Sequence, residues 1–459
     1  MAEQIAWQKV ANAKTNKSEV KAMIKILKNT QKDFETEFDK ILLRGSEDIS
    51  EVTPKVESIL CEVRENGLSA LLSQVERFDK WNPKSLEDLQ ITQKECQDAY
   101  DSLDKRTKEA LHIAYERIYA FHSKEKKQSW LDFEANGSVL GAKYSPVERA
   151  GLYIPGGKAS YPSSLLMNAI PAIVAGVESI VVCTPTPLKQ TNSLLLAALH
   201  ICNIKEIYKV GGASAVGLMA YGIKSSAQNP SIKKADVITG PGNIYVATAK
   251  KLVFGEVGID MIAGPSEIAI IADSSANAEY LAHDLLSQAE HDEMASSFLF
   301  TPDENLANIV SQKVEQILES LPKKAIAKSS IDNRGAIIIC NDIAQCVEHC
   351  NALAPEHLEL MVASPFELLP SIKNAGAIFL GTNTPEPIGD YLAGPNHTLP
   401  TGGSARFFSP LGVEHFMKKS SVIYFSKEAI NTLGTPCAHL AELEDLHAHA
   451  KAVLARIKS

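Results

Sequence analysis

Beyond residue 128, short apolar segments alternate with stretches of helical spacing, and this alternation limits the fold more than any other feature. About ten or more residues of helical spacing follow most of the apolar segments. Strands that alternate with helices form parallel sheets, and strands buried on both faces are almost entirely apolar. We therefore predict an α/β fold with parallel sheets. The predicted strands are Ser179–Cys183, Glu206–Val210, Asp236–Thr239, Glu267–Ala272, Ser297–Thr301, Ala336–Cys340, Leu358–Val362 and Ala377–Leu380.

A chain of 459 residues is too long for one ordinary core, so we expect two or more domains. From Glu37 to Gln128 the spacing of apolar residues is helical. The first ~35 residues are rich in lysine and show weak helical spacing from Val20 to Leu27, which favours one or two exposed helices rather than a strand. Residues Lys427–Ser459 also have helical spacing, and we expect them to pack away from the sheets.

Composition and charge exclude several classes of protein. The chain has 46 lysine and arginine residues against 55 aspartate and glutamate residues, which argues against nucleic acid as the main partner. The apolar stretches are shorter than a membrane span, and residues 1–14 lack the pattern of a secretory signal. The eight cysteines are scattered, as is typical of a reducing compartment. We therefore expect a cytoplasmic enzyme without a membrane partner.

Two glycine-containing turns follow predicted strands or precede predicted helices. Gly240-Pro241-Gly242-Asn243 precedes a helix from Ile244, and Tyr153-Ile154-Pro155-Gly156-Gly157 is similar. Such turns let a phosphate approach the free amides of a helix N-terminus, and ligands of open sheets bind at the carboxyl ends of strands. The chain has no complete G-x-G-x-x-G fingerprint. On its own, each turn fits a tight connection at least as well as a phosphate-binding loop.

Two pairs of polar residues are candidates for a site. Gln288 and His291 end a predicted helix that starts at Asn277, and their spacing places them on one helical face. Imidazole is the commonest zinc ligand, although a histidine at a helix C-terminus also has a purely structural role. Glu356 and His357 follow a predicted helix, Asp342–Asn351, and such a pair can titrate near neutral pH once the surroundings shift its pKa values, although adjacent glutamate and histidine residues also occur by chance.

The segment Gly381–Gly403 is long and rich in proline and glycine, and loops of this kind inside a compact domain are usually functional. Asp390 in this segment is a candidate metal or substrate ligand, whereas His397 fits a turn equally well. Near the C-terminus, His447 and His449 are two positions apart and point in different directions around a helix. At most one of these two histidines can therefore bind a given ion.

Taken together, four motifs resemble the histidinol dehydrogenase family in order and spacing. The resemblance extends from about residue 37 to residue 457, which is nearly the whole chain. The motifs are Gly264-Pro265-Ser266-Glu267, Asp284-Leu285-Leu286-Ser287-Gln288-Ala289-Glu290-His291-Asp292, Pro355-Glu356-His357-Leu358, and Gly389-Asp390-Tyr391 with Asn396-His397-Thr398-Leu399-Pro400.

The resemblance implies two incomplete Rossmann-like domains with parallel sheets, plus N- and C-terminal helical segments that intertwine two subunits into a homodimer. The larger domain would consist of residues 52–152 and 267–411, and the smaller, NAD-binding domain of residues 153–266. Residues 1–51 would form an N-terminal helical extension and arm, and residues 412–459 a C-terminal helical dimerisation segment.

The resemblance also implies the site. Zinc would be held by Gln288, His291 and Asp390, with His449 donated by the partner subunit. The NAD contacts would be Tyr153, Ser214 and Asn243. The positions that match substrate contacts are Ser266, Gln288, His291, Glu356, His357, Asp390, Glu444 and His449, with Glu444 also given by the partner subunit.

The reaction implied is the NAD-dependent, four-electron oxidation of L-histidinol via L-histidinal to L-histidine, the last step of histidine biosynthesis. His357 would act as the general base and Glu356 would activate water, while zinc would mainly orient the substrate. An alternative is a zinc-dependent hydrolase that uses the same ligands without NAD. A thiol-dependent aldehyde dehydrogenase and a non-catalytic protein with the same fold are weaker alternatives.

The sequence departs from the family at two points. Ser214 stands where the family commonly has a glutamine that contacts NAD, so we expect Tyr153 and Asn243 to be firmer contacts. Members of the family begin near the position of Glu37, so residues 1–33 are an extension relative to them. The separation from Glu444 favours His449 over His447 as the ligand.

Overall fold

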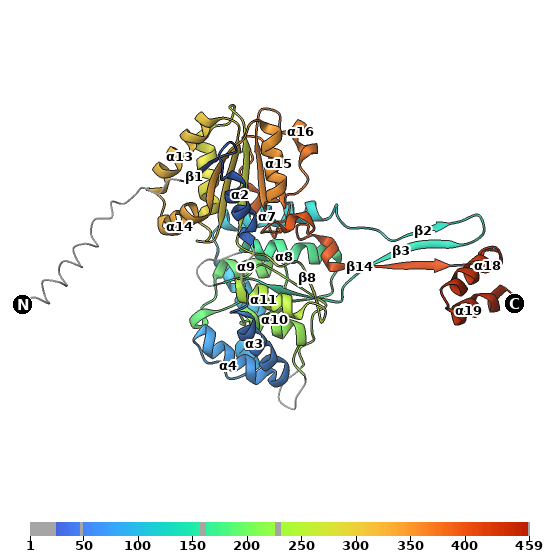
Figure 1. The fold of residues 1–459 in the computed structure, drawn as a ribbon. Coiled ribbons are helices and arrows are strands. Elements are labelled where there is room, and N and C mark those ends of the chain that lie inside the picture. Colours follow the sequence, from blue (N-terminus) through green and yellow to red (C-terminus); the bar gives the residue numbers. More distant parts are fainter. Residues whose placement is uncertain (1–23, 46–48, 157–161, 225–230, 458–459) are drawn as a thin grey trace, which may run out of the picture. The chain divides into compact units, whose positions relative to one another are not determined.

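The computed structural model describes residues 24–45, 49–156, 162–224 and 231–457 (Figure 1). Contacts between Cα atoms divide the chain into two compact units. The first unit consists of residues 1–56, 241–251 and 261–410, and the second of residues 57–240, 252–260 and 411–459.

Within the described part of the first unit, six strands form one parallel sheet in the order β1-β11-β10-β9-β12-β13. The residues of β9, β10, β11 and β12 are buried along the whole length of each strand, which confirms the predicted parallel sheet. The strands are β1 (Lys25–Lys28), β9 (Glu267–Ala272), β10 (Ser296–Thr301), β11 (Gly335–Ile339), β12 (His357–Met361) and β13 (Ala377–Leu380).

Helices cover both faces of this sheet, and the alternation of side chains along β9 shows which face each helix covers (Figure 1). Ile268 and Ile270 pack in a cluster with α12 (Ala278–Ala289), α13 (Glu304–Leu318) and α14 (Lys324–Arg334). Ile271 packs in a second cluster with α2 (Phe34–Leu42) and α15 (Ile343–Leu353). Successive strand residues point to opposite faces, so a fully apolar strand supplies both clusters. The shorter helices of this unit are η1 (Leu43–Gly45), α16 (Pro365–Leu368), η3 (Leu369–Ser371), α17 (Glu386–Tyr391) and η4 (Ser404–Arg406).

The strand β1 corrects the helical interpretation of residues 20–27. Lys25–Lys28 pairs in parallel with β11 at the edge of the sheet. Ile24 belongs to one core cluster and Leu27 to the other, so these two buried residues lie on opposite faces. A spacing of three residues suggests one face of a helix, but it also fits a strand that is buried on both faces. The remainder of the predicted N-terminal helices, residues 1–23, lies outside the described residues.

In the described part of the second unit, a five-stranded parallel sheet has the order β6-β5-β4-β7-β8. The chain runs outward from β4 in one direction and returns to add β7 and β8 on the other side of β4. This reversal of strand order is the place where open α/β sheets bind ligands. The elements of this sheet and its helices are β4 (Arg149–Tyr153), α8 (Pro162–Ala175), β5 (Ser179–Cys183), η2 (Pro187–Lys189), α9 (Ser193–Ile201), β6 (Glu206–Tyr208), α10 (Gly212–Tyr221), β7 (Val237–Thr239), α11 (Ile244–Val253) and β8 (Gly258–Ile259), with residues 241–251 assigned to the first unit.

The helical spacing before residue 128 is confirmed by α3 (Thr53–Asn66), α4 (Leu68–Asp79), α5 (Leu86–Leu89), α6 (Gln93–Ser102) and α7 (Lys105–His122). Residues 57–152 belong to the second unit, whereas the resemblance grouped residues 52–152 with residues 267–411. The compact units therefore differ from the expected domain boundaries over this helical segment.

A three-stranded antiparallel ribbon in the second unit joins β2 (Trp130–Phe133), β3 (Val139–Pro146) and β14 (Met417–Tyr424). The strand β14 lies after η5 (Val413–Phe416), inside the segment 412–459 that we expected to be helical throughout. The segment ends in two helices as predicted, α18 (Lys427–Leu443) and α19 (His447–Ile457), which pack on each other through Gly434 and Ile457. No helix among the described residues is long and apolar enough to cross a membrane.

Candidate active site

Glu356 and His357 enter the first sheet together, at the start of β12. Ala354 follows α15 in a left-handed conformation, with φ at 49°, and turns the chain into Pro355 and Glu356. Because β12 lies between β9 and β13 in the sheet, both side chains are enclosed. Glu356 is 5% exposed and His357 is 4% exposed. The predicted acid–base pair therefore lies in a largely water-free setting.

The predicted site residues of the first unit lie toward the amino end of its strands. His357 is the first residue of β12, and Ser266 directly precedes β9. Helix α12 follows β9 and packs against β9 and β10, and its last turn carries Gln288. A helix that follows a parallel strand runs back along the sheet, so its C-terminus returns to the amino end of the strands. The expectation that ligands gather at the carboxyl ends of strands therefore does not hold for Glu356 and His357, which lie at the amino end of β12.

Two hydrogen bonds to residue 267 hold the acid–base pair. The backbone N–H of Glu267 donates to Oε2 of Glu356 at 2.8 Å. Nδ1 of His357 lies 2.9 Å from the carbonyl oxygen of Glu267. Since a carbonyl oxygen can only accept, the proton of the neutral imidazole sits on Nδ1. Nε2 is then left with a lone pair, and within the described residues this buried atom has no hydrogen-bond partner.

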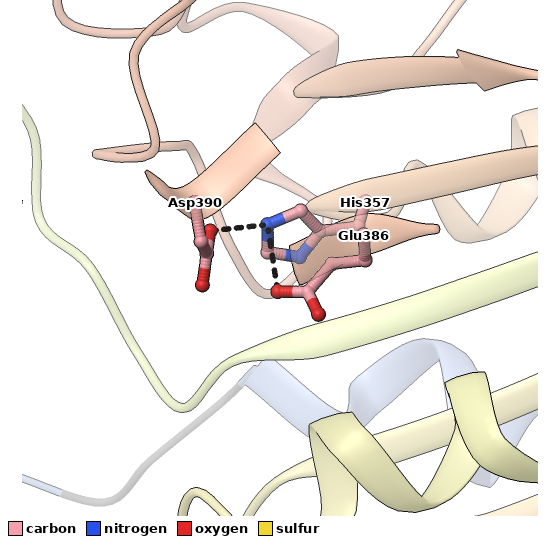
Figure 2. A group of neighbouring side chains, drawn as sticks. All are labelled: His357, Glu386 and Asp390. Atoms are coloured by element: carbon pink, nitrogen blue, oxygen red, sulfur yellow. Dashed lines mark ion pairs between the residues drawn. The ribbon is translucent and has the colours of Figure 1, made fainter. Parts of the chain in front are cut away.

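Two carboxyl groups from α17 face Nε2 of His357 (Figure 2). An oxygen of Glu386 and an oxygen of Asp390 each lie 3.9 Å from this nitrogen. Glu386 is almost fully buried, and 17% of the Asp390 side chain is exposed. Ligand atoms of His357, Glu386 and Asp390 lie within 4.8 Å of one another, which is compact enough to hold a metal ion. The two carboxyl groups form an acidic wall beside the neutral imidazole of His357.

Burial shifts the pKa values of the acid–base pair in opposite directions. Loss of water raises the pKa of Glu356 well above its ordinary value, and the carboxylates of Glu267, Asp390 and Glu386 add to this effect. Burial lowers the pKa of His357, although Asp390 opposes the shift. Burial, together with Asp390, also raises the pKa of Glu386 to about 9. The pocket therefore favours a neutral imidazole and carboxyl groups that hold protons more tightly than usual.

The predicted zinc ligands Gln288 and His291 are adjacent at the end of α12. Nε2 of Gln288 lies 3.2 Å from Nδ1 of His291. Gln288 is fully buried, yet its Oε1 has no hydrogen-bond partner within the described residues. The charge of His291 contributes to lowering the pKa of both His357 and His397, so its imidazole lies close enough to interact with them. The two motifs, which are far apart in sequence, thus come together in one site.

His397 is held by the segment that carries Asp390. Its Nδ1 lies 3.1 Å from the carbonyl oxygen of Asp390 and 3.7 Å from a carboxylate oxygen of the same residue. The sequence left open whether His397 is a ligand or part of a turn, and these contacts place it as a support for Asp390.

A model of the histidinol dehydrogenase family matches residues 42–457 of the chain. The chain belongs to the histidinol dehydrogenase family. It is 63% identical to the histidinol dehydrogenase of Helicobacter hepaticus, with 93% of this chain and 97% of that protein covered. It is 61% identical to the histidinol dehydrogenase of Wolinella succinogenes, with 95% and 99% covered. A crystal structure of histidinol dehydrogenase from Elizabethkingia anophelis matches with a TM-score of 0.87 and 34% identity, covering 95% of this chain and 98% of that one.

Membership of the histidinol dehydrogenase family confirms the resemblance and makes the chain an oxidoreductase. It also favours the dehydrogenase interpretation over the zinc-dependent hydrolase that the sequence left open. The match to the solved histidinol dehydrogenase supports the α/β fold with parallel sheets.

The residues predicted to contact NAD fall in both units. Tyr153 ends β4 and is almost fully buried, with its hydroxyl accepting from the backbone N–H of Gly212 at 3.3 Å. Ser214 is buried in the first turn of α10. Asn243 belongs to the first unit and caps α11, where its Oδ1 accepts from the backbone N–H of Tyr245 at 3.1 Å. Glu444 and His449 are both exposed, at the end of α18 and in α19 of the second unit.

Sequence reasoning did not single out three buried carboxyl groups at or next to this candidate site, those of Glu386, Glu359 and Asp284. Glu386 faces His357, and its backbone N–H donates to Oε1 of the fully buried Glu359 at 2.8 Å. Desolvation raises the pKa of Asp284 to about 6, and a hydrogen bond to Glu359 opposes this rise. Glu359 could have been found from the sequence, because it is a carboxylate inside the apolar run Leu358–Met361, and a buried charge needs specific partners.

Proposed function

We propose that this chain catalyses the NAD-dependent oxidation of L-histidinol via L-histidinal to L-histidine. Membership of the histidinol dehydrogenase family supports the reaction. The observation that carries the proposal is the buried His357, whose Nδ1 is bound to the Glu267 carbonyl and whose Nε2 is free to accept a proton. An alcohol oxidation needs such a base, because the hydroxyl proton must leave as the hydride departs.

The charge of the pocket fits an amine substrate. Glu356, Glu386 and Asp390 surround His357, and carboxyl groups favour a cationic amino group. The imidazole and amino nitrogens of histidinol would also find oxygen and nitrogen atoms on Gln288 and His291. Specificity for an amino alcohol therefore follows from the same acidic wall that faces the base.

The residues of the first unit fit a zinc ion. A buried amide oxygen without a hydrogen-bond partner, as in Gln288, is costly unless a ligand satisfies it. Gln288, His291 and Asp390 would hold the ion, and His449 of the partner subunit would complete the protein ligands. When bound, zinc would hold the nitrogens of the substrate and orient its hydroxyl carbon.

In the first oxidation, Nε2 of His357 accepts the proton of the substrate hydroxyl, and a hydride leaves the carbon that bears this hydroxyl and passes to NAD. Loss of one proton and one hydride converts the alcohol to the aldehyde. The lowered pKa of His357 keeps its imidazole neutral and able to accept this proton at neutral pH. The hydrogen bond to the Glu267 carbonyl keeps Nε2, rather than Nδ1, as the accepting atom.

In the second oxidation, Glu356 removes a proton from a water molecule whose oxygen attacks the aldehyde carbon. A second hydride then leaves that carbon for a second NAD, which gives the carboxylic acid, and loss of the acid's proton to solvent gives the carboxylate. The raised pKa of Glu356 gives its carboxylate more affinity for a proton than an exposed glutamate has. Its Oε2 accepts from the Glu267 backbone, which leaves Oε1 for the water.

We also propose that the enzyme is a homodimer in which Glu444 and His449 serve the partner's site. Large apolar side chains are exposed along the ribbon and its two C-terminal helices, among them Phe133 (74%), Ile423 (71%) and Leu443 (69%). Apolar side chains exposed over one continuous segment are typical of a surface that another subunit covers. The intertwining of two subunits would bury this ribbon and bring α19 to a second active site.

The remaining assignments are proposals of the same kind. Tyr153, Asn243 and Ser214 would contact NAD, with residues 153–266 as the NAD-binding domain and residues 52–152 and 267–411 as the larger domain. The switch in strand order at β4 supports this place for the cofactor. The cysteines form no disulfides, which is typical of proteins in a reducing compartment, and we propose that the enzyme is cytoplasmic.

The decisive test is NADH formation from L-histidinol, measured with metal-stripped and zinc-restored protein side by side. We expect about two NADH per histidinol oxidised, from the two hydride transfers. Stripping the metal should abolish turnover, and zinc should restore it. A folded, zinc-loaded protein that makes no NADH from histidinol would exclude the proposed reaction.

A further inference from the structure

Residue 267 holds both members of the acid–base pair through its main chain. Its N–H donates to Glu356 and its carbonyl oxygen accepts from His357. A shift of this one peptide segment would displace the general base and the water-activating carboxylate together. What fixes the start of β9 therefore controls the geometry of both oxidation steps.

The side chain of Glu267 is itself fixed at both carboxylate oxygens. Nη2 of Arg44 lies 2.7 Å from Oε2, and both side chains are buried, with 5% and 3% exposed. The backbone N–H of Gly402 donates to Oε1 at 2.9 Å. A guanidinium group holds a carboxylate in a defined orientation better than an ammonium group does.

Arg44 also contacts the segment that leads into Glu356. Its Nη2 donates to the carbonyl oxygen of Leu353, the last residue of α15, at 3.0 Å. Its guanidinium group lies 5.7 Å from the centre of the Phe298 ring on β10. Arg44 thus joins the start of β9 to the end of α15, and α15 is separated from Glu356 by only Ala354 and Pro355.

We propose that Arg44 and Glu267 are positioning residues: their buried ion pair aligns Glu356 and His357 for the two hydride-transfer steps. This inference rests on the proposed function. Neither residue needs to touch the substrate, because the alignment acts through the main chain of residue 267 and the end of α15. Gln288, His291 and Asp390 lie on other segments, so zinc and substrate affinity should depend much less on the pair.

Removing one partner of a buried ion pair leaves the other charge without compensation, whereas replacing both by neutral groups avoids this cost. Arg44→Met should leave a buried carboxylate that pulls the start of β9 out of place. Glu267→Gln keeps an oxygen for the Gly402 N–H and removes the charge. The double substitution should therefore be less harmful than Arg44→Met alone.

The test uses full-length, zinc-loaded wild type, Arg44→Met, Glu267→Gln, the double variant and Arg44→Lys. A misplacement of ~1 Å costs about 100-fold, so we expect kcat of Arg44→Met to fall about 100-fold, with KM for histidinol and zinc content within about threefold of wild type. Arg44→Lys keeps the positive charge but loses the planar guanidinium group with its several N–H donors, and it should lower kcat about tenfold. The double variant should recover part of the kcat lost in Arg44→Met. Lys313→Met is the matched control, because it breaks a 2.8 Å ion pair with Glu279 on the surface of the same unit and should leave kcat unchanged.

If the wild type makes NADH, several results for the variants would overturn the positioning role of Arg44 and Glu267. These are a kcat of Arg44→Met within about threefold of wild type, a parallel loss of zinc or substrate affinity, or additive losses in the double variant. If Arg44→Met does not fold, Arg44→Lys decides: an unchanged kcat would exclude the positioning role. A wild type without NADH formation would instead overturn the proposed function, so the two failures are distinct.

Discussion

The imidazole of His357 and the carboxyl group of Glu356 occupy one buried pocket but respond to it in opposite ways. Burial favours the neutral form of each, which lowers the pKa of the imidazole and raises that of the carboxyl group. The imidazole therefore stays neutral, and the carboxyl group holds a proton more tightly than an exposed glutamate does. A base for the alcohol and a base for water can then work in the same site.

The two residues should be separable by following each oxidation on its own. For His357→Asn we expect the oxidation of histidinol to fall by a factor of about 10² to 10⁴, because loss of a positioned base removes proton transfer. For Glu356→Gln the oxidation of histidinal should fall by a similar factor, and the oxidation of histidinol should fall less. The measurement is NADH formation in single turnovers started from each substrate.

His283→Asn is the matched control for the histidine substitution, since His283 is exposed on α12 and should not affect either rate. Equal losses in both half-reactions for each variant would contradict the division of roles between His357 and Glu356.

The residues of this site were predictable from sequence only where they belong to contiguous motifs. Glu356 and His357 are adjacent, and Gln288 and His291 are three residues apart, so local spacing made both pairs candidates and the family resemblance assigned their roles. The role of Glu267 depends on contacts with Glu356, His357 and Arg44, which are 89, 90 and 223 residues away. No local pattern predicts contacts over such distances.

At the scale of elements, periodicity predicted most strands of the two parallel sheets and the long helices, but it missed β4 at the centre of the second sheet and β8 at its edge. Helices α12, α13 and α15 are capped by the preceding residues Asn277, Asp303 and Asp342, whose side chains accept hydrogen bonds from the first turn. Such caps contribute about 1 kcal/mol each and are readable from sequence. The edge strand β1 was misinterpreted, and the ribbon strands β2, β3 and β14 were not predicted. The ribbon has no fully buried face, so its sequence lacks the continuous apolar run of a central strand.

The docking of β1 makes a prediction about stability. Leu27 is 4% exposed and packs in the cluster with α2 and α15. Leu27→Ala should lower the free energy of unfolding by about 2–4 kcal/mol, because it removes buried methyl groups and leaves a cavity. Lys25→Ala on the same strand removes only a surface ion pair with Glu37 and should cost about 0–1 kcal/mol.

Urea unfolding monitored by circular dichroism measures both changes. If these residues formed an exposed helix, the two substitutions would change the free energy of unfolding by nearly the same amount. Equal changes would therefore contradict the assignment of residues 25–28 to a buried strand.

At the scale of the whole molecule, the second unit ends in a surface that a monomer would leave to water. Trp130 and Phe133 on β2, and Ile423 and Tyr424 on β14, are each more than half exposed. The same ribbon continues into α18 and α19, which carry Glu444 and His449. A shared interface and a shared active site would therefore have one structural origin, and stability and activity would both depend on pairing.

This arrangement predicts complementation between two inactive chains. His449→Ala should be inactive because it cannot complete the partner's site, and His357→Asn should be inactive because it lacks the base. In a heterodimer of the two, one site combines an intact His357 with an intact His449 from the other chain, and the second site carries both defects. Purified through two different tags, this heterodimer should show about half the wild-type activity per dimer, because one of its two symmetry-related sites is intact.

The control replaces His449→Ala with His447→Ala, which should be active by itself if His449 is the ligand. An inactive heterodimer would mean that His449 serves the site of its own chain. The proposed exchange across the dimer would then be wrong, although the chemistry assigned to Glu356 and His357 in the first unit would stand.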